Sequence, residues 1–307
     1  MSMGLGMMAP DATDTLKQYM ENLVAMVGNA EASGEGVKLV INGVVKKAMP
    51  VAPEVPIDEL ASVAPKNAAM VAAAEGFDVA WTELKKQISS SPGFKSQIDQ
   101  ALAQARQMLK IDPYADVLDR IKAIGLYYVP KPALKPQGLP GSIIFVLRVD
   151  KPDVIAKTLA KIHAAAASMG GVKLTAVPMG GVKVNVGPSD PSGVRFWDAL
   201  SGNKVILGIT GVDFKASAKD AIAAAAGKGP TAASSAGFEL VKRQLPAKST
   251  FLFYGDAASI VKTFKKEMSD EDRKVAEAIT KSVGTFGAAG TYKGTQYEAL
   301  CVAPFAK

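Results

Sequence analysis

Ser259 and Lys262 have the spacing of an acyl-transfer pair and are the strongest candidates for chemistry in this sequence. They form an S-x-x-K pattern at the start of a predicted helix, where an amine one helical turn from a hydroxyl can accept its proton. The S-D-N triplet that accompanies this pattern in serine enzymes is missing, and K-T-G occurs only scrambled, as Lys293-Gly294-Thr295. A serine hydrolase using Ser259 and Lys262 is therefore only an alternative, and the sequence favours a protein without catalytic residues.

Metal and cofactor chemistry has little support in the sequence. Cys301 is the single cysteine, which excludes an intramolecular disulfide and a thiolate metal cluster. His163 is the single histidine, and it follows the apolar Ile162 on a predicted helix, so we interpret it as an ordinary, partly exposed helical residue. The glycine-rich turns at 180–181 and 287–290 match no phosphate or dinucleotide loop. We therefore expect no cofactor and no metal.

The acidic residues have structural interpretations. Asp112, Asp116 and Asp119 precede a predicted helix and lack the ligand spacing, glycine and terminal glutamate of a calcium loop. Asp78 and Asp256 each follow a strand and a glycine-containing turn, as helix N-caps do, and such a cap stabilises a helix by about 1 kcal/mol. Their shared place at a strand end could also line a binding cleft.

The elements that would position these residues occur in two similar sets. Residues 245–266 contain a proline, an apolar strand, a glycine, an aspartate and a helix ending in two lysines, and residues 64–86 repeat that order. A second series, strand, helix, Gly-Val-Lys-Leu, glycine turn and strand, occurs at 3–49 and at 143–186. We interpret the chain as an internal duplication.

Hydrophobic periodicity and turn residues predict the individual elements. In the first copy we expect a strand at 3–8, a helix from Pro10 with an apolar stripe reaching Val27, and a hairpin turning at Asn42-Gly43. Further helices are predicted at 78–87, 94–110 and 117–124, with a strand at 126–129. In the second copy the predicted elements are a strand at 143–149, a helix from Pro152 to Gly170-Gly171, and hairpins at 172–186, 194–210 and 285–303, with helices at 213–226, 236–244 and after Ser269.

The predicted fold class is α+β, with two diverged tandem copies of a strand-helix-strand-strand unit. The sheets should be mainly antiparallel, with helices packed on one face. The first copy spans 1–135, and the second spans 141–307 and carries an inserted hairpin and helix; a proline-rich segment at 130–140 joins them. Because the first strand would begin at Met3, the sequence leaves open whether the chain starts inside a longer gene product, without its signal or anchor.

Charge and hydropathy limit the partners. Residues 151–307 carry 21 basic and 13 acidic side chains, whereas residues 1–60 carry 4 and 8. The lysines are scattered and rarely alternate with aromatics, which argues against a nucleic-acid groove, although a basic half could attract an anionic surface. No apolar run is long enough for a transmembrane helix, and the first residues lack the basic region of a signal peptide.

The sparse aromatic residues lie in predicted strands, where neighbouring side chains point to opposite faces. We expect alternate members of Tyr127-Tyr128, Phe196-Trp197 and 251–254 to be core residues. The exposed members could form a sugar- or lipid-contacting surface, although packing is the favoured interpretation.

With these patterns assembled, the chain resembles a bacterial family of often exported proteins, the domain-of-unknown-function family 3352. The resemblance covers most of residues 60–307. It is carried by the strand and Ala-rich helix at 204–226, by the helix, Leu-Pro, strand and Asp at 234–256, and by the Asp-Pro-x-x-Asp-hydrophobic segment at 111–121. It implies export or association with the cell envelope. The family has no assigned catalytic residues, so no residue role carries over.

The sequence thus predicts a non-catalytic, extracytoplasmic bacterial protein of the envelope or surface, with a binding or structural role. Its ligand, protein partner and oligomeric state are not predicted. A carrier of a lipid or another hydrophobic ligand, enclosed between sheet and helices, is the second hypothesis.

Overall fold

The structure is a computed structural model that describes residues 23–46, 48, 51–90, 92–265 and 268–305. The strand predicted at 3–8 and most of the predicted N-terminal helix lie outside these residues.

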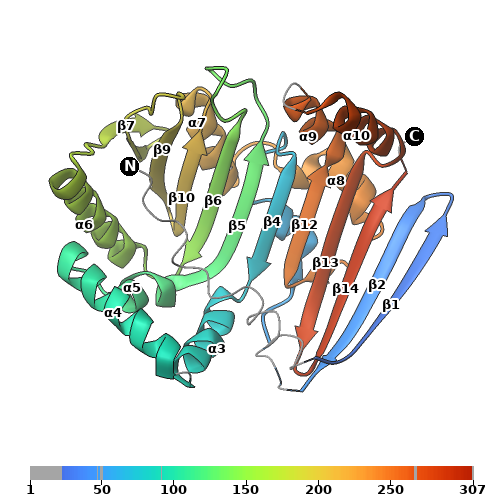
Figure 1. Ribbon diagram of the computed structural model, residues 1–307, viewed down its shortest axis with the longest axis horizontal. Helices are drawn as coiled ribbons and strands as arrows, with labels where there is room; N and C mark the ends of the chain where they lie inside the picture. The colour runs from blue at the N-terminus through green and yellow to red at the C-terminus, as the bar shows by residue number, and fades with distance from the viewer. Residues whose placement is uncertain (1–22, 47, 49–50, 91, 266–267, 306–307) are drawn as a thin grey trace.

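One sheet of twelve strands extends across the described part of the chain (Figure 1). Its neighbouring strands all pair antiparallel, as the closely spaced hairpins predict. In order across the sheet the strands are β1 (Leu23–Ser33), β2 (Gly36–Val45), β14 (Gln296–Pro304), β13 (Thr285–Lys293), β12 (Phe251–Asp256), β4 (Met70–Glu75), β5 (Ile121–Val129), β6 (Ser142–Val149), β10 (Lys204–Thr210), β9 (Arg195–Ser201), β8 (Val182–Val186) and β7 (Thr175–Met179). A separate small sheet pairs β3 (Val55–Pro56) with β11 (Lys248–Ser249).

Helices lie on both faces of the large sheet. Ile206 packs into the main core with α2 (Ile57–Ala61), α7 (Phe214–Ala225) and α8 (Ala236–Lys242), whereas its neighbour Val205 packs against α6 (Pro152–Gly170). Successive residues of a strand point to opposite faces, so these two cores lie on opposite sides. The prediction of helices on one face only is wrong.

The remaining helices accompany α6 on its side of the sheet. In chain order they are α3 (Phe77–Ser90), α4 (Pro92–Leu109), α5 (Pro113–Asp116), the 3-10 turn η2 (Leu118–Arg120), α9 (Ala257–Phe264) and α10 (Asp270–Ser282). Another 3-10 turn, η3 (Ala232–Ser234), precedes α8.

The middle of the sheet is a junction between β4 and β12, which pair directly. From β4 the chain continues through α3 and α4 to β5 and β6, and from β12 through α9 and α10 to β13 and β14. Each set is extended by a hairpin, β9–β10 beside β6 and β1–β2 beside β14. Groups of strands from residues 1–135 and from residues 141–307 therefore alternate across one sheet. The two predicted copies do not form separate sheets, and the tandem duplication divided near residue 140 stays a prediction.

Two of the helices predicted in the first half are wrong over part of their length. Residues 23–27 belong to β1 instead of a helix, because residues 25–33 pair one for one with β2 and this ladder outweighs the helical spacing of the apolar residues. Residues 121–124 likewise begin β5, so the helix predicted at 117–124 is confined to the short turn η2. The shared Gly-Val-Lys-Leu also differs in structure, because Gly36 opens β2 whereas Gly171 starts a loop before β7.

The second half follows the sequence closely. Pro152 lies in the first turn of α6, and the helix ends at Gly171, whose φ of 63° suits glycine. Ser269 caps α10 by accepting a hydrogen bond from the Asp272 N–H at 3.1 Å. The hairpins β9–β10 and β13–β14 are confirmed.

Candidate functional site

The most unusual surface of the molecule is an exposed apolar strip on interior strands of the sheet. Phe196, Ile209, Phe145 and Ile124 lie on β9, β10, β6 and β5, and their side chains are 38–45 % exposed. Phe196 is directly opposite Ile209 in the ladder. Interior strands normally bury such residues, so a contiguous exposed group marks a candidate interaction surface.

The strip continues across the sheet through half-buried apolar residues. One register row, directly paired from strand to strand, consists of Leu207, Phe145, Leu126, Ala72 and Phe253. We call the side of the sheet that bears these residues and the four exposed ones the open face. Its apolar side chains thus extend from β9 to β12.

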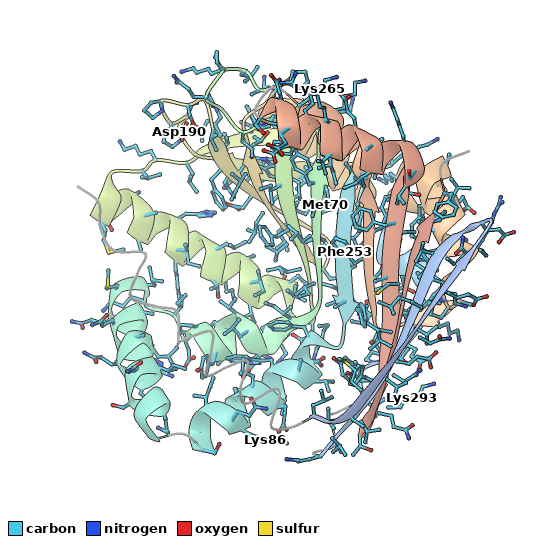
Figure 2. The ribbon with its side chains drawn as sticks, turned by 45° about the vertical axis from the view of Figure 1, so that its right-hand side comes forward. Met70, Lys86, Asp190, Phe253, Lys265 and Lys293 are labelled. Carbon is cyan, nitrogen blue, oxygen red and sulfur yellow. The ribbon has the colours of Figure 1, made fainter. Side chains whose placement is uncertain are left out.

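Within the described part of the chain, helices close the open face only at its margins (Figure 1). At one end Ile155 of α6 packs on Ile121, Val149 and Val205. At the other end Phe264 of α9 stacks on Tyr128, with ring centroids 5.9 Å apart. In Figure 2, Met70 and Phe253 lie on the sheet between these two groups of helices.

His163 contacts a buried carboxylate beside the open face. Its Nε2 lies 2.8 Å from Oδ2 of Asp198, and Asn185 donates to the other oxygen at 2.9 Å. The Asp198 side chain is 1 % exposed, so both partners are needed to satisfy a polar group out of water. His163 is partly buried on its helix as predicted, but the sequence did not indicate that it would bond to Asp198.

Ser259 and Lys262 have no geometry for acyl transfer. The Ser259 hydroxyl donates to Oδ2 of Asp256 at 2.8 Å, and the Ser259 backbone N–H donates to Oδ1 at 2.9 Å. Asp256 is therefore the N-cap of α9, as predicted. The Ser259 hydroxyl, which Lys262 would have to activate, already donates its hydrogen bond to Asp256.

The other predicted acidic residues have structural partners. Asp112 caps α5 by accepting from the N–H groups of Tyr114 and Ala115. Asp119 accepts from Trp81 Nε1 at 2.7 Å and from Lys85 Nζ at 2.6 Å. Burial alone would raise the pKa of Asp119, but these two hydrogen bonds, together with the charges of Lys85 and Arg120, outweigh it and lower that pKa below its usual 3.8.

Asp78 differs from its predicted role. It lies inside the first turn of α3, which begins at Phe77, and its Oδ2 accepts from Lys122 Nζ at 2.9 Å. Gly76, ahead of the helix, instead supplies the carbonyl for the first N–H groups of the turn. Asp78 and Asp256 therefore do not form an equivalent pair of caps.

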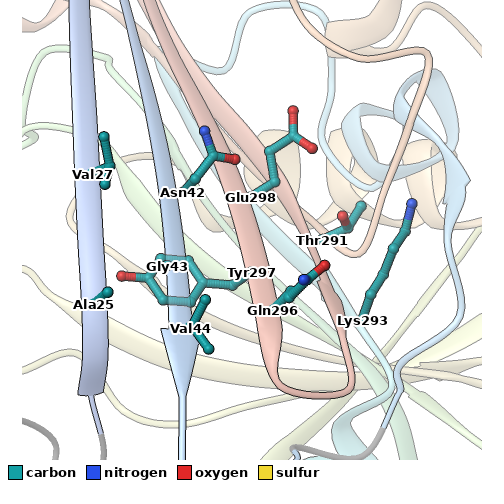
Figure 3. A pocket seen from close by; sticks show the side chains of 10 residues that line it. All are labelled: Ala25, Val27, Asn42, Gly43, Val44, Thr291, Lys293, Gln296, Tyr297 and Glu298. Carbon is teal, nitrogen blue, oxygen red and sulfur yellow. The ribbon is translucent and has the colours of Figure 1, made fainter.

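A separate hollow of about 300 Å³ lies near the free edge of the sheet, on β1, β2, β13 and β14 (Figure 3). Its lining combines apolar side chains of β1 with Asn42, Gln296 and Glu298. Tyr297 is opposite Gly43 in the ladder, and a Cβ on Gly43 would lie 1.9 Å from Cε1 of its ring. Asn42-Gly43 is therefore not the predicted turn, because the glycine lies within β2, beneath an aromatic ring.

The face covered by α2 and α7 also holds partly buried charged groups. Glu75 pairs with Arg148, and burial raises the pKa of Glu75 although the Arg148 charge and hydrogen bond oppose that shift. Burial lowers the pKa of Lys204, whose Nζ donates to the carbonyl of Ala225 at 2.7 Å. These groups lie away from the open face, and we assign them a structural role.

Metal-ligand clusters are not found among the described residues, and Cys301 is a free, half-buried thiol. No helix of this part of the chain has the length and apolar character needed to cross a membrane. The fold and surface thus define an α+β protein built on one wide antiparallel sheet, one face of which the described helices leave largely open.

Comparison with known proteins places the chain in a family. The family model described as Protein of unknown function (DUF3352) matches residues 7–294, and the chain belongs to this family, which confirms the resemblance. No curated protein and no solved structure matches the chain.

Proposed function

We propose that this chain is a non-catalytic binding protein of the bacterial envelope and that its open face holds the acyl chains of a lipid or a similar apolar ligand. The observation that carries the proposal is the exposure of Phe196, Ile209, Phe145 and Ile124 on interior strands. The envelope location is supported by the family resemblance, which implied export or association with the cell envelope; the chain belongs to that family.

The composition and surroundings of the open face favour a narrow apolar ligand. Its exposed side chains are aromatic or branched aliphatic, and covering one of them fully contributes about 1.5–3 kcal/mol. Helices lie along two margins of the open face (Figure 1), a border that suits a narrow ligand better than a flat, folded partner. This favours the carrier hypothesis among the binding roles that the sequence left open.

Ligand binding can be tested with a fluorescent fatty acid and with lipid extraction of the purified protein. Phe145→Glu places a charge in the middle of the open face and should weaken binding by about tenfold or more, the equivalent of losing about 1.5 kcal/mol of apolar contact. Leu240→Glu is the control, because Leu240 is 40 % exposed on α8, a helix of the opposite face.

Three outcomes would contradict the proposal. One is the absence of both co-purifying lipid and saturable probe binding, and another is equal binding by the Phe145→Glu and Leu240→Glu variants. The third concerns location: recovery of the full-length gene product in the cytosolic fraction would contradict envelope association.

A further inference from the structure

The free edge of β1 is an unprotected β-strand edge. β1 is eleven residues long, and after Leu23 every one of its residues is exposed. Met26 and Val27 are 60 % and 65 % exposed. No described strand pairs with this edge, which ends the order of the sheet.

Hydrogen-bond alternation identifies the backbone groups that face outward. The carbonyl of Glu35, just before β2, accepts from the Phe305 N–H, and the Val45 N–H at the end of β2 donates to the carbonyl of Thr295. The odd-numbered residues of β2 therefore bond toward β14. The even-numbered residues of β2 bond toward β1, where their partners are the odd-numbered residues. The N–H and C=O groups of Met26, Gly28, Ala30 and Ala32 therefore point away from the sheet.

The opposite edge of the sheet is protected, in contrast. β7 has only five residues, and it contains Pro178. Met179 and Val182 flank the Gly180-Gly181 turn and form a hydrogen-bonded pair, so the next pair, Pro178 and Lys183, directs its backbone groups away from each other. Pro178 therefore leaves the outer edge of β7 without an N–H donor at this position. Short length and an outward proline are the devices that prevent strand addition, and β1 has neither.

We propose that the occupant of the β1 edge is the β1 strand of a second copy of this chain, paired antiparallel about a two-fold axis. An exposed row of backbone donors and acceptors is matched by another extended strand. Antiparallel pairing of identical edges is two-fold symmetric, and because β7 cannot add a strand, assembly stops at a dimer instead of continuing into a fibre.

Charge supports self-pairing. Glu31 is the only charged residue of β1, and it lies toward one end. In a two-fold register centred near Gly28 it faces Ala25 of the second copy, so like charges do not oppose one another. In the same arrangement the exposed Met26 faces Ala30 of the second copy, an apolar cross-strand neighbour.

The dimer can be tested by sedimentation equilibrium of the full chain. The expected species has twice the 32.0 kDa chain mass. Ala30→Pro removes an outward N–H without removing a β1–β2 hydrogen bond, and should raise the dissociation constant by about thirtyfold or more, since each dimer loses the bond twice. Ala30→Ser keeps the N–H and is the matched control, expected to dimerise like the parent chain.

A second pair of variants keeps the test decisive if the proline disturbs the hairpin. Met26→Lys/Ala30→Lys and Met26→Glu/Ala30→Glu should each be monomeric, and an equimolar mixture should form a heterodimer. A parent chain that stays monomeric over the accessible concentration range would overturn the proposal. A dimer that survives Ala30→Pro and both charged variants would also overturn it, by placing the contact elsewhere.

Discussion

The indole ring of Trp197 lies over the backbone of Gly208, its direct partner on the neighbouring strand. A Cβ built on Gly208 would lie 2.1 Å from Cε2 of the ring, and the Trp197 side chain is fully buried. The ring therefore has no room to withdraw. Aromatic rings that cover a cross-strand glycine in this way also fix the register of the two strands.

Gly208→Ala should consequently destabilise the protein by about 1–3 kcal/mol, the usual cost of overpacking a filled core. Urea unfolding followed by tryptophan fluorescence measures it. Gly93→Ala is the control, because a Cβ at Gly93 in α4 meets nothing within 4 Å and should be neutral or slightly stabilising. An equal effect of the two substitutions would show that the Trp197 contact is not restrictive.

The His163–Asp198 pair leads to a second prediction. His163→Ala should lower the free energy of unfolding by about 1–3 kcal/mol, because it leaves one oxygen of a buried carboxylate without its partner. Lys157→Ala, at an exposed position of the same helix, should be close to neutral. Thermal unfolding of both variants measures the difference.

A double-mutant cycle tests whether that cost comes from the pair. Combining His163→Ala with Asp198→Asn should cost less than the sum of the two single changes, since the second change removes the charge that the first leaves unpaired. Strict additivity would mean that His163 contributes through packing alone.

Glu75 should make the stability of the protein depend on pH. Burial raises its pKa above 4.5 in the folded protein, so the folded state binds this proton more tightly than the unfolded state does. The contribution of Glu75 to the free energy of unfolding should therefore fall as the pH rises through the window above 4.5, and recover as the pH is lowered.

Glu75→Gln isolates this contribution. The difference in unfolding free energy, wild type minus variant, should become more positive as the pH falls from neutral toward 4.5. Urea titrations at a series of pH values measure it. A constant difference would show that the interaction with Arg148 cancels the effect of burial, and a change in the opposite direction would show that it outweighs burial.

Local sequence signals predict the second half of the chain well. Ser269, Pro152 and Gly171 determine helix ends through their own backbone and side-chain chemistry, so neighbouring residues suffice to predict them. Predictions for the first half fail where a residue distant in sequence determines the local structure. Asn42-Gly43 has the composition of a turn, yet its glycine accommodates Tyr297, a contact that local sequence does not contain.

The candidate site was partly predictable for the same reason. Strand alternation predicts that Phe196 and Trp197 point to opposite faces, and the structure buries Trp197 and exposes Phe196. Which face stays open depends on where α7 and the α3–α6 group pack, and therefore on the order of strands across the sheet. That order joins β2 to β14, from opposite ends of the chain, and periodicity gives no information about it.

The N-cap of α9 connects stability with the open face. Asp256 holds the first turn of α9 through Ser259, and at the other end of this helix Phe264 stacks on Tyr128 at one margin of the face. Asp256→Ala should cost about 1 kcal/mol of global stability, as the loss of a cap does, and should weaken apolar-probe binding because the margin of the face loosens. Ser259→Ala keeps the Asp256 carboxylate as acceptor for the backbone N–H and should change both quantities less. If Ser259→Ala abolished a measurable activity while leaving stability intact, Ser259 would be a catalytic residue and its assignment to the cap would be wrong.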